Sequence, residues 1–301
     1  MGPTLIGPRE GRHLQDYRIK ATAAGGRLRA MGAVITESAR AVETVHRALP
    51  LAAAAMGRLM VGAAFLSADF KGDEFVHLET DGGGPLGRVI AEGYADGMLR
   101  ARVDHPDVSL PLRPDGKLAV GQAVGRDGRL LVRRHLDNGG IYSSYVPLQS
   151  GEIGADLARY FTESEQVASA VAVGVLVGRD GQVLGAGGVL VQTLPDAPRT
   201  LVDDVEERLH VLGSVSYPVA DGATAEDLIR RILPEPIRYG EPARVRFDCR
   251  CDRSDLKPLL LTLPSEEREE MAKTGGAEVV CQYCRTAYRY GTTDLGLSPQ
   301  A

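Results

Sequence analysis

The chain has 301 residues, of which 44% are hydrophobic and 25% are charged, and these fractions are typical of a globular protein with a sizeable core. Its net charge of -5 argues against a surface dominated by nucleic-acid binding, and the lack of tryptophan leaves little material for stacking single-stranded bases. The longest apolar run, at 167–178, is too short to span a membrane, and the N-terminus becomes charged before a signal-like segment develops, so we expect a cytoplasmic protein without a membrane anchor.

The first third of the chain predicts strands and then helices. Residues 16–35 alternate polar and apolar side chains around Gly25 and Gly26, which predicts a β-hairpin. From Thr36 apolar residues recur at helical spacing, and Pro50 is expected to end that helix. The segment at 51–70 is almost entirely apolar and rich in small residues, so it predicts a buried helix packed closely on a sheet.

The middle third predicts short strands separated by glycine-containing turns. Gly-Arg-Asp-Gly occurs at 125–128 and at 178–181, and each copy is interpreted as a hairpin turn. Residues 82–87 match Gly-x-Gly-x-x-Gly, but Pro85 lies inside the match and a strand-like pattern follows, so a glycine-rich hairpin is favoured over a dinucleotide site. Ser150 is expected to cap a helix, and two buried strands follow that helix. The predicted fold class is α+β, with a mixed sheet-and-helix core domain at 1–195.

The composition changes after Leu194, where prolines become frequent. Residues 196–244 are interpreted as a metastable helical linker, semi-detached from the core domain. The first predicted linker helix carries apolar residues on one face and acidic residues on the other; the apolar ones are Leu201, Val205, Leu209 and Leu212. Because short amphipathic helices depend on docking for their stability, we expect these four side chains to pack against the core.

All four cysteines lie near the C-terminus, as Cys249, Cys251, Cys281 and Cys284. In a reducing compartment, paired cysteines favour metal binding or redox chemistry over structural disulfides. Four thiolates form the structural environment that zinc prefers, so residues 245–290 are predicted to be a small four-cysteine module that binds Zn²⁺. Nearby arginines are expected to offset the charge of the site; they are Arg250, Arg253, Arg285 and Arg289. The tail at 291–301 is expected to be disordered.

The C-x-C spacing of the first pair indicates a second possibility besides a purely structural site. Two sulfurs at this spacing come within disulfide range if the backbone moves. Zinc-bound thiolates are nucleophiles toward peroxide or hypochlorous acid, and local disulfides would expel the metal. Since so small a module has little core of its own, loss of zinc would unfold it. A structural zinc site without a switch is the simpler alternative.

Four segments together carry a family resemblance: FDCRCD at 247–252, AEVVCQYCRTAYRY at 277–290, YSSYVPLQSGEIGADLARYFTESEQVASAVAVGVLV at 142–177, and AGGVLVQTLP at 186–195. On these segments the chain resembles the heat-shock protein 33 family of redox-regulated bacterial holdases. The resemblance implies an ATP-independent chaperone, not an enzyme, that is inactive while reduced and zinc-bound.

The resemblance also implies how such a chaperone is activated. Oxidation would form Cys249–Cys251 and Cys281–Cys284 disulfides, release zinc and unfold the linker. The core domain would then serve client binding and dimerisation, with unfolded or aggregating proteins as clients and a homodimer as the active form. Our own addition is that the four apolar linker residues, Leu201, Val205, Leu209 and Leu212, bind clients once they are exposed.

Two other functions are compatible with the residues. A zinc-ribbon module that binds nucleic acid or protein without switching would need basic surface, but residues 244–290 hold nearly equal numbers of basic and acidic residues, so we expect no specific nucleic-acid partner. A thiol-disulfide oxidoreductase would place C-x-x-C at the start of a helix, whereas strands are predicted on both sides of Cys281 and Cys284. The six histidines show no ligand spacing and are interpreted as surface or capping residues.

Overall fold

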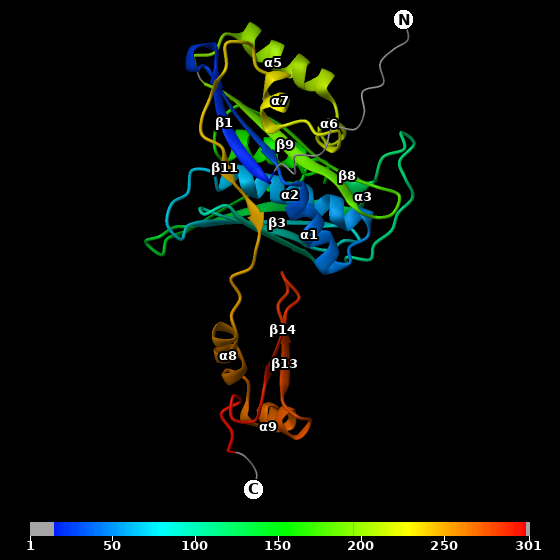
Figure 1. Ribbon diagram of the computed structural model, residues 1–301, viewed down its shortest axis with the longest axis vertical. Coiled ribbons are helices and arrows are strands. Elements are labelled where there is room, and N and C mark those ends of the chain that lie inside the picture. The colour runs from blue at the N-terminus through cyan, green and yellow to red at the C-terminus, as the bar shows by residue number, and fades with distance from the viewer. Residues whose placement is uncertain (1–14, 195, 299–301) are drawn as a thin grey trace, which may run out of the picture.

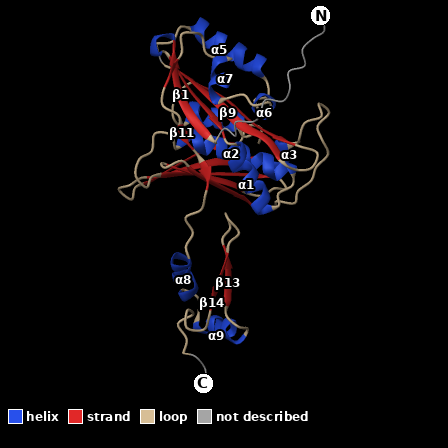
Figure 2. Cartoon of the chain, in the orientation of Figure 1, coloured by secondary structure: helices blue, strands red, loops and turns tan. Residues whose placement is uncertain are grey.

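In the computed structural model, which describes residues 15–194 and 196–298, two sheets enclose one central helix (Figures 1 and 2). This helix, α2 (Pro50–Leu66), is buried over almost its whole length, as its apolar sequence predicts. Small residues allow the close packing: a β-carbon added to Gly62 would lie 2.7 Å from a methyl carbon of Leu157. Pro50 is the first residue of α2 and not the end of the preceding helix, because proline suits the first turn of a helix, where its missing N–H is not needed.

The sheet on one side of α2, here called sheet A, has the strand order β10-β1-β2-β9-β8, with β11 also paired to β1. The turn at Ala24–Gly26 joins β1 to an antiparallel β2, which confirms the predicted hairpin. The strands of sheet A are β1 (Tyr17–Ala23), β2 (Leu28–Val34), β8 (Ser169–Val177), β9 (Val183–Thr193), β10 (Arg238–Tyr239) and β11 (Ala243–Arg244).

The sheet on the other side of α2, sheet B, has the strand order β12-β5-β4-β3-β6-β7. Only β12 runs parallel to its neighbour among the described pairings of this sheet. The glycine-rich loop at 82–87 joins antiparallel β3 and β4, as predicted. The strands of sheet B are β3 (Phe75–Gly83), β4 (Val89–Tyr94), β5 (Met98–Val103), β6 (Gly125–His135), β7 (Ile141–Pro147) and β12 (Arg246–Phe247).

The two Gly-Arg-Asp-Gly segments have different structures. The copy at 178–181 turns the chain between β8 and β9, as predicted. The copy at 125–128 is not a hairpin turn, because helix α3 (Val120–Val124) leads directly into it and it forms the start of β6. Gly125 has φ 82° and lies opposite an irregularity in the pairing of β3 with β6. Glycine is used here to join a helix to a bulged strand.

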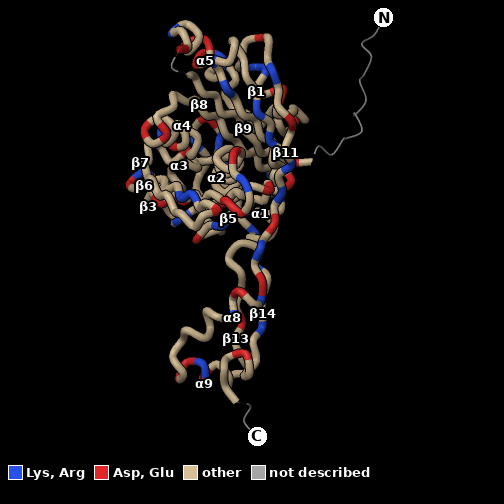
Figure 3. Tube along the Cα trace, turned by 90° about the vertical axis from the view of Figure 1, so that its left-hand side faces the viewer, with Lys and Arg blue, Asp and Glu red and all other residues tan. Residues whose placement is uncertain are grey.

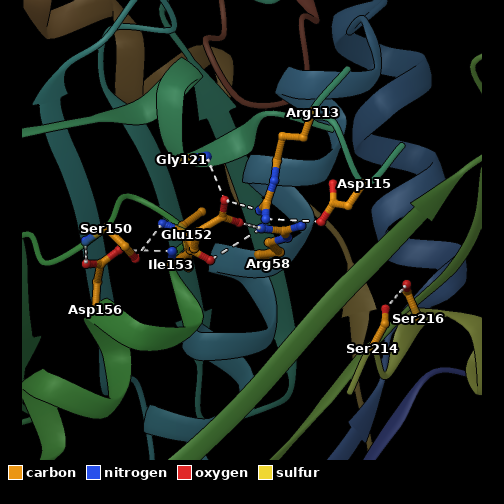
Figure 4. Close-up of polar contacts among 10 residues, drawn as sticks. All are labelled: Arg58, Arg113, Asp115, Gly121, Ser150, Glu152, Ile153, Asp156, Ser214 and Ser216. Carbon is orange, nitrogen blue, oxygen red and sulfur yellow. Dashed lines mark hydrogen bonds and ion pairs between the residues drawn. The ribbon is translucent and has the colours of Figure 1, made fainter. Parts of the chain in front are cut away.

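A buried carboxylate organises the turn that leads into α4 (Gly154–Glu163) (Figure 4). Asp156 accepts hydrogen bonds from the backbone N–H groups of Gln149 at 2.7 Å, Ser150 at 3.1 Å and Ile153 at 2.9 Å. Ile153, not Ser150, precedes the helix, so the predicted serine cap is wrong. The hydroxyl of Ser150 instead accepts a hydrogen bond from the N–H of Glu152 within the turn.

The side chain of Glu152 joins this turn to the central helix (Figure 4). Its carboxylate pairs with Arg58 of α2 at 2.7 Å and with Arg113 at 3.1 Å, and it accepts the backbone N–H of Gly121 at 3.4 Å. Helix α1 (Thr36–His46) lies beside α2 and completes the core domain.

Three helices of the predicted linker cover the outer face of sheet A: α5 (Arg199–Leu212), α6 (Ser216–Ala220) and α7 (Ala225–Arg230). Glycines of the sheet allow them to come very close. A β-carbon added to Gly32 of β2 would lie 2.8 Å from the carbonyl oxygen of Ala225, and one added to Gly185 of β9 would lie 2.6 Å from the amide nitrogen of Ala220. The segment is therefore not semi-detached, and its last residues add β10 and β11 to the edge of sheet A.

The C-terminal module projects from the side of sheet B and contains α8 (Arg253–Leu261), α9 (Ser265–Lys273), β13 (Ala277–Val280) and β14 (Ala287–Tyr290) (Figure 1). Basic and acidic residues both occur along its length (Figure 3). Its small core is formed by Leu260, Tyr290 and Leu295. Because Leu295 is fully buried there, the prediction of a disordered tail is wrong for residues 291–298, while 299–301 lie outside the described residues.

Candidate metal centre

The four cysteines come together at the end of the module that faces the core. Cys249 and Cys251 lie between β12 and α8, and Cys281 and Cys284 lie in the turn between β13 and β14. All four sulfur atoms lie within 4.8 Å of one another. Two segments separated by about thirty residues of sequence thus supply one cluster, because the β13–β14 hairpin returns its turn to the start of the module.

The spacing of the sulfurs fits a tetrahedral zinc ion. Cys249 Sγ lies 3.7 Å from Cys281 Sγ, and Cys251 Sγ lies 3.3 Å from Cys284 Sγ. Four sulfurs each bonded to zinc at about 2.3 Å would stand about 3.8 Å apart at the corners of a tetrahedron. A disulfide would bring two sulfurs to about 2.05 Å, and all four thiols are free. The donor set and its size are therefore compatible with a Cys₄ zinc site.

Local hydrogen bonds shape the turn that carries the second pair. The N–H of Cys281 donates to the carbonyl of Thr286, and the N–H of Arg285 donates to the carbonyl of Cys281, both at 2.9 Å. Arg285 has φ 60°, which closes the turn tightly. Strands flank this C-x-x-C, as predicted, so it does not start a helix as the thiol-disulfide oxidoreductase alternative would require.

The thiols differ in how readily they ionise. Burial raises the pKa of Cys249 and of Cys251. Burial also opposes ionisation of Cys284, but hydrogen bonds with the side chain and backbone of Thr286 outweigh it and lower the pKa of Cys284 to about 7. A bound cation favours the thiolate form of all four groups, so metal uptake releases protons.

Three of the four arginines expected to offset the charge of the site are paired with acidic residues. Arg250 pairs with Asp96 at 3.3 Å, Arg253 pairs with Asp294, and Arg289 pairs with Glu278. The arginine that donates toward a sulfur instead belongs to the core: Arg100 Nη1 of β5 lies 3.7 Å from Cys249 Sγ. The predicted arginines are close to the cysteines in sequence, whereas the fold brings Arg100 to the cysteines from a distant strand.

A tyrosine between the last two cysteines reaches the core. The hydroxyl of Tyr283 donates to Oε1 of Glu92 on β4 at 2.8 Å. The guanidinium of Arg100 lies over the Tyr283 ring, 4.1 Å from its centroid. The sequence patterns did not indicate Tyr283, Glu92 or Arg100; the available signal was an acidic residue inside the otherwise apolar strand VIAEGY.

Glu92 is a buried carboxylate with four donors. Besides Tyr283, it accepts hydrogen bonds from His77 at 3.0 Å, Tyr94 at 2.8 Å and Arg100 at 2.6 Å. Burial raises its pKa, but the hydrogen bond from His77, the charge of Arg100 and the two tyrosine hydroxyls outweigh burial and lower the pKa of Glu92 to about 2.

Two histidines have structural contacts that the sequence did not indicate. His46 Nε2 of α1 lies 3.0 Å from the carbonyl oxygen of Tyr283 and 3.1 Å from that of Ala101. His77 belongs to the Glu92 cluster. The interpretation of these two as surface or capping residues is wrong, since both are half-buried at or near the contact between module and core.

The apolar linker residues lie on α5 and contact the core. Val205 is 2% exposed and belongs to the cluster between the linker helices and sheet A. The leucines of the same face are half-buried against this cluster; they are Leu201, Leu209 and Leu212. The predicted packing of this face is therefore confirmed.

Within the described residues, no helix is long and apolar enough to cross a membrane.

Comparison with known proteins agrees with this architecture over nearly the whole chain. The family model described as Hsp33 protein matches residues 16–291. The 33 kDa chaperonin of Staphylococcus aureus (strain JH9) is 37% identical over 284 residues, which cover 94% of this chain and 97% of that protein. The crystal structure of the 33 kDa chaperonin (heat shock protein 33 homolog) from Thermotoga maritima superimposes with a TM-score of 0.85 at 33% identity, covering 94% of this chain and 97% of that one. The chain therefore belongs to the Hsp33 family, whose members are chaperones and not enzymes.

Proposed function

We propose that this chain is a redox-regulated, ATP-independent holdase that is inactive while reduced and zinc-bound. The observation that carries the proposal is the convergence of the four sulfurs, within 4.8 Å, at the end of the module that touches the core. Cys249, Cys251, Cys281 and Cys284 would hold Zn²⁺, and the metal would supply the cross-link that the small module lacks.

Oxidation would convert this site into two disulfides. Each pair loses two electrons to an oxidant such as hypochlorous acid or peroxide, one S–S bond forms within Cys249–Cys251 and one within Cys281–Cys284, and zinc leaves with no thiolate to hold it. In the reduced protein all four thiols are free, and Cys249 and Cys251 also contact sulfurs of the other pair, so the two sulfurs of each pair must approach each other for these bonds to form.

Loss of the metal would then free the linker, which we take as residues 196–244, from the core domain at 1–195. Burial of Val205 and half-burial of the α5 leucines mean that unfolding would expose a continuous apolar surface. Such a surface binds other unfolded chains, so we propose that Leu201, Val205, Leu209 and Leu212 contact clients under oxidative stress. We further propose that the protein acts in the cytoplasm, as a homodimer in its active form and without a specific nucleic-acid partner.

Zinc release and chaperone activity should be measured in one experiment. Reduced, zinc-loaded protein is treated with hypochlorous acid beside a heat-denatured client, while a chromogenic chelator records zinc and light scattering records aggregation. We expect one zinc per chain to be released as scattering falls, and a thiol reductant to reverse the protection. Mass spectrometry of the oxidised protein should find disulfides within the two pairs.

Two results would contradict the proposal. Zinc release without any fall in scattering would leave the module as a structural support or as a binding module of the zinc-ribbon kind. If the reduced, zinc-loaded protein protects the client from aggregation as well as the oxidised protein does, the protein has no redox switch. Cys281→Ser is the matched variant, because it should lose zinc without being able to form the second disulfide.

A further inference from the structure

One residue of the cysteine turn makes several of the contacts between the module and the core. Tyr283 projects from the turn between Cys281 and Cys284, and its hydroxyl, ring and backbone carbonyl each have a different partner in the core: Glu92 at 2.8 Å, Arg100 at 4.1 Å from the ring centroid, and His46 at 3.0 Å. Glu92 and Arg100 lie opposite each other on β4 and β5, His46 comes from α1, and all three are far from Tyr283 in the sequence.

The core side of this contact is built from residues of sheet B. With the module in place Glu92 is 5% exposed, and His77, Tyr94 and Arg100 of this sheet all donate to it. Its low pKa keeps it ionised over the physiological range. A buried carboxylate with fixed neighbours is a good acceptor for one more hydroxyl, because little ordering is required when that hydroxyl arrives.

The module side depends on the shape of the cysteine turn. Tyr283 lies between two of the four sulfurs, and the hydrogen bonds between Cys281, Arg285 and Thr286 set the direction in which it projects. The first cysteine pair is attached separately: the N–H of Asp248 donates to Leu99 at 3.2 Å through the β12–β5 pairing, and Arg250 pairs with Asp96. The segments that carry both cysteine pairs are thus tied to sheet B.

We propose that Glu92 and its neighbours on sheet B form a receptor site for the zinc module of this same chain, with Tyr283 as the residue that occupies it. The core would then sense the state of the cysteine site directly through Tyr283, besides any effect transmitted through the linker on the opposite sheet. This inference rests on the proposed function in one respect, since it assumes that bound zinc shapes the turn that carries Tyr283. The contact itself does not require the redox switch.

The test compares two tyrosines that donate to the same carboxylate. Tyr283→Phe removes the donor that belongs to the module, and Tyr94→Phe removes the donor that belongs to the core. Hydrogen–deuterium exchange of the reduced, zinc-loaded full chain is followed in peptides covering 245–252 and 281–286, with zinc content measured in the same samples. Tyr283→Ala extends the series by removing the ring that Arg100 covers.

We expect Tyr283→Phe to keep one zinc per chain and to raise exchange in both peptides by roughly tenfold, since a hydrogen bond to a charged group is lost. Tyr283→Ala should raise it further, and Tyr94→Phe should leave both peptides near the wild-type rate. Removing zinc from the reduced wild type with a chelator should also raise exchange in 245–252.

Unchanged exchange in Tyr283→Ala would overturn the proposal. Loss of zinc from Tyr283→Phe would overturn it as well, because the tyrosine would then support the metal site and not the docking. If the wild type binds no zinc, the proposed function fails, yet the comparison of Tyr283→Phe with Tyr94→Phe still decides whether the module docks through Tyr283.

Discussion

Two buried carboxylates fix separate parts of this molecule, and both are surrounded by donors. Asp156 holds a turn of the core through three backbone N–H groups, whereas Glu92 is held by four side chains from both the core and the module. In each case the donors compensate for the loss of hydration that burial imposes on an ionised group. Removing either acid would leave its donors buried without an acceptor.

Asp156→Ala should destabilise the core. It deprives three backbone N–H groups of their acceptor, and we expect a loss of about 2–4 kcal/mol in the free energy of unfolding. Asp180→Ala is the control, because Asp180 is exposed and accepts one backbone N–H, from Gln182. Urea denaturation followed by circular dichroism measures both. A similar small loss in the two variants would show that the turn is held by other contacts.

The stability that Glu92 contributes should depend on pH. Because the folded protein lowers the pKa of Glu92 to about 2, ionised Glu92 stabilises the fold above its ordinary pKa of about 4.3, and this contribution disappears as pH falls toward 2. Relative to Glu92→Gln, the wild type should be more stable by on the order of 3 kcal/mol at neutral pH.

Thermal unfolding of the wild type and Glu92→Gln at pH 7, 5, 4 and 3 measures this contribution. Acid also protonates the cysteines, but it does so in both proteins, so the difference between them isolates Glu92. The difference in stability between the wild type and Glu92→Gln should be constant down to about pH 5 and then become smaller. A difference that stays constant to pH 3 would mean that the carboxylate is not stabilised by its donors.

At the scale of elements, α5 shows how an amphipathic helix is held by one face. Val205 is buried under it, while Val211 of the same helix is 78% exposed. Helix α5 has few contacts with sheet A, whereas α6 and α7 lie directly on the glycines of this sheet. Its attachment therefore depends on a short apolar stripe, and one charge placed in that stripe should release it.

Val205→Asp should expose the linker in the reduced protein without changing zinc content. Burying a carboxylate in place of an apolar side chain costs several kcal/mol, which exceeds what a short stripe can supply. Limited proteolysis should cut within 196–244, and a zinc assay should still find the metal. Val211→Asp is the control on the same helix and should remain resistant. Full resistance of reduced Val205→Asp would show that α5 is held in some other way.

At the scale of the whole molecule, the chain combines a large core with a module that has only a small one. Leu260, Tyr290 and Leu295 are the buried residues around which the module packs, whereas the main core surrounds α2. A core of this size cannot by itself offset the conformational entropy of about fifty residues, so the sulfur cluster should decide whether the module folds.

Chelation of zinc under reducing conditions should therefore unfold the module and spare the core. We expect hydrogen exchange across 253–290 to rise to nearly the unfolded rate, while α2 keeps its protection. Adding zinc back should restore the module. Protection of 253–290 that survives complete removal of the metal would show that side-chain packing alone holds it.

Much of this organisation could be predicted from the sequence, because it depends on local patterns. The apolar α2, the hairpin at Ala24–Gly26, the amphipathic α5 and the grouping of the cysteines all leave a periodicity or a spacing in the chain. The docking of Tyr283 on Glu92 leaves none, since its partners come from β4, β5 and α1 and meet only in three dimensions. The burial of Leu295 was missed for the same reason.

The glycines beneath α6 and α7 have a further consequence. If the helices leave, Gly32 and Gly185 expose peptide planes where other sheets would present protruding side chains. Around these glycines the same face carries apolar side chains, among them Ile19, Val189 and Val191. Departure of the helices would therefore uncover an apolar face interrupted by exposed backbone, which suits contact with the apolar segments of an extended chain.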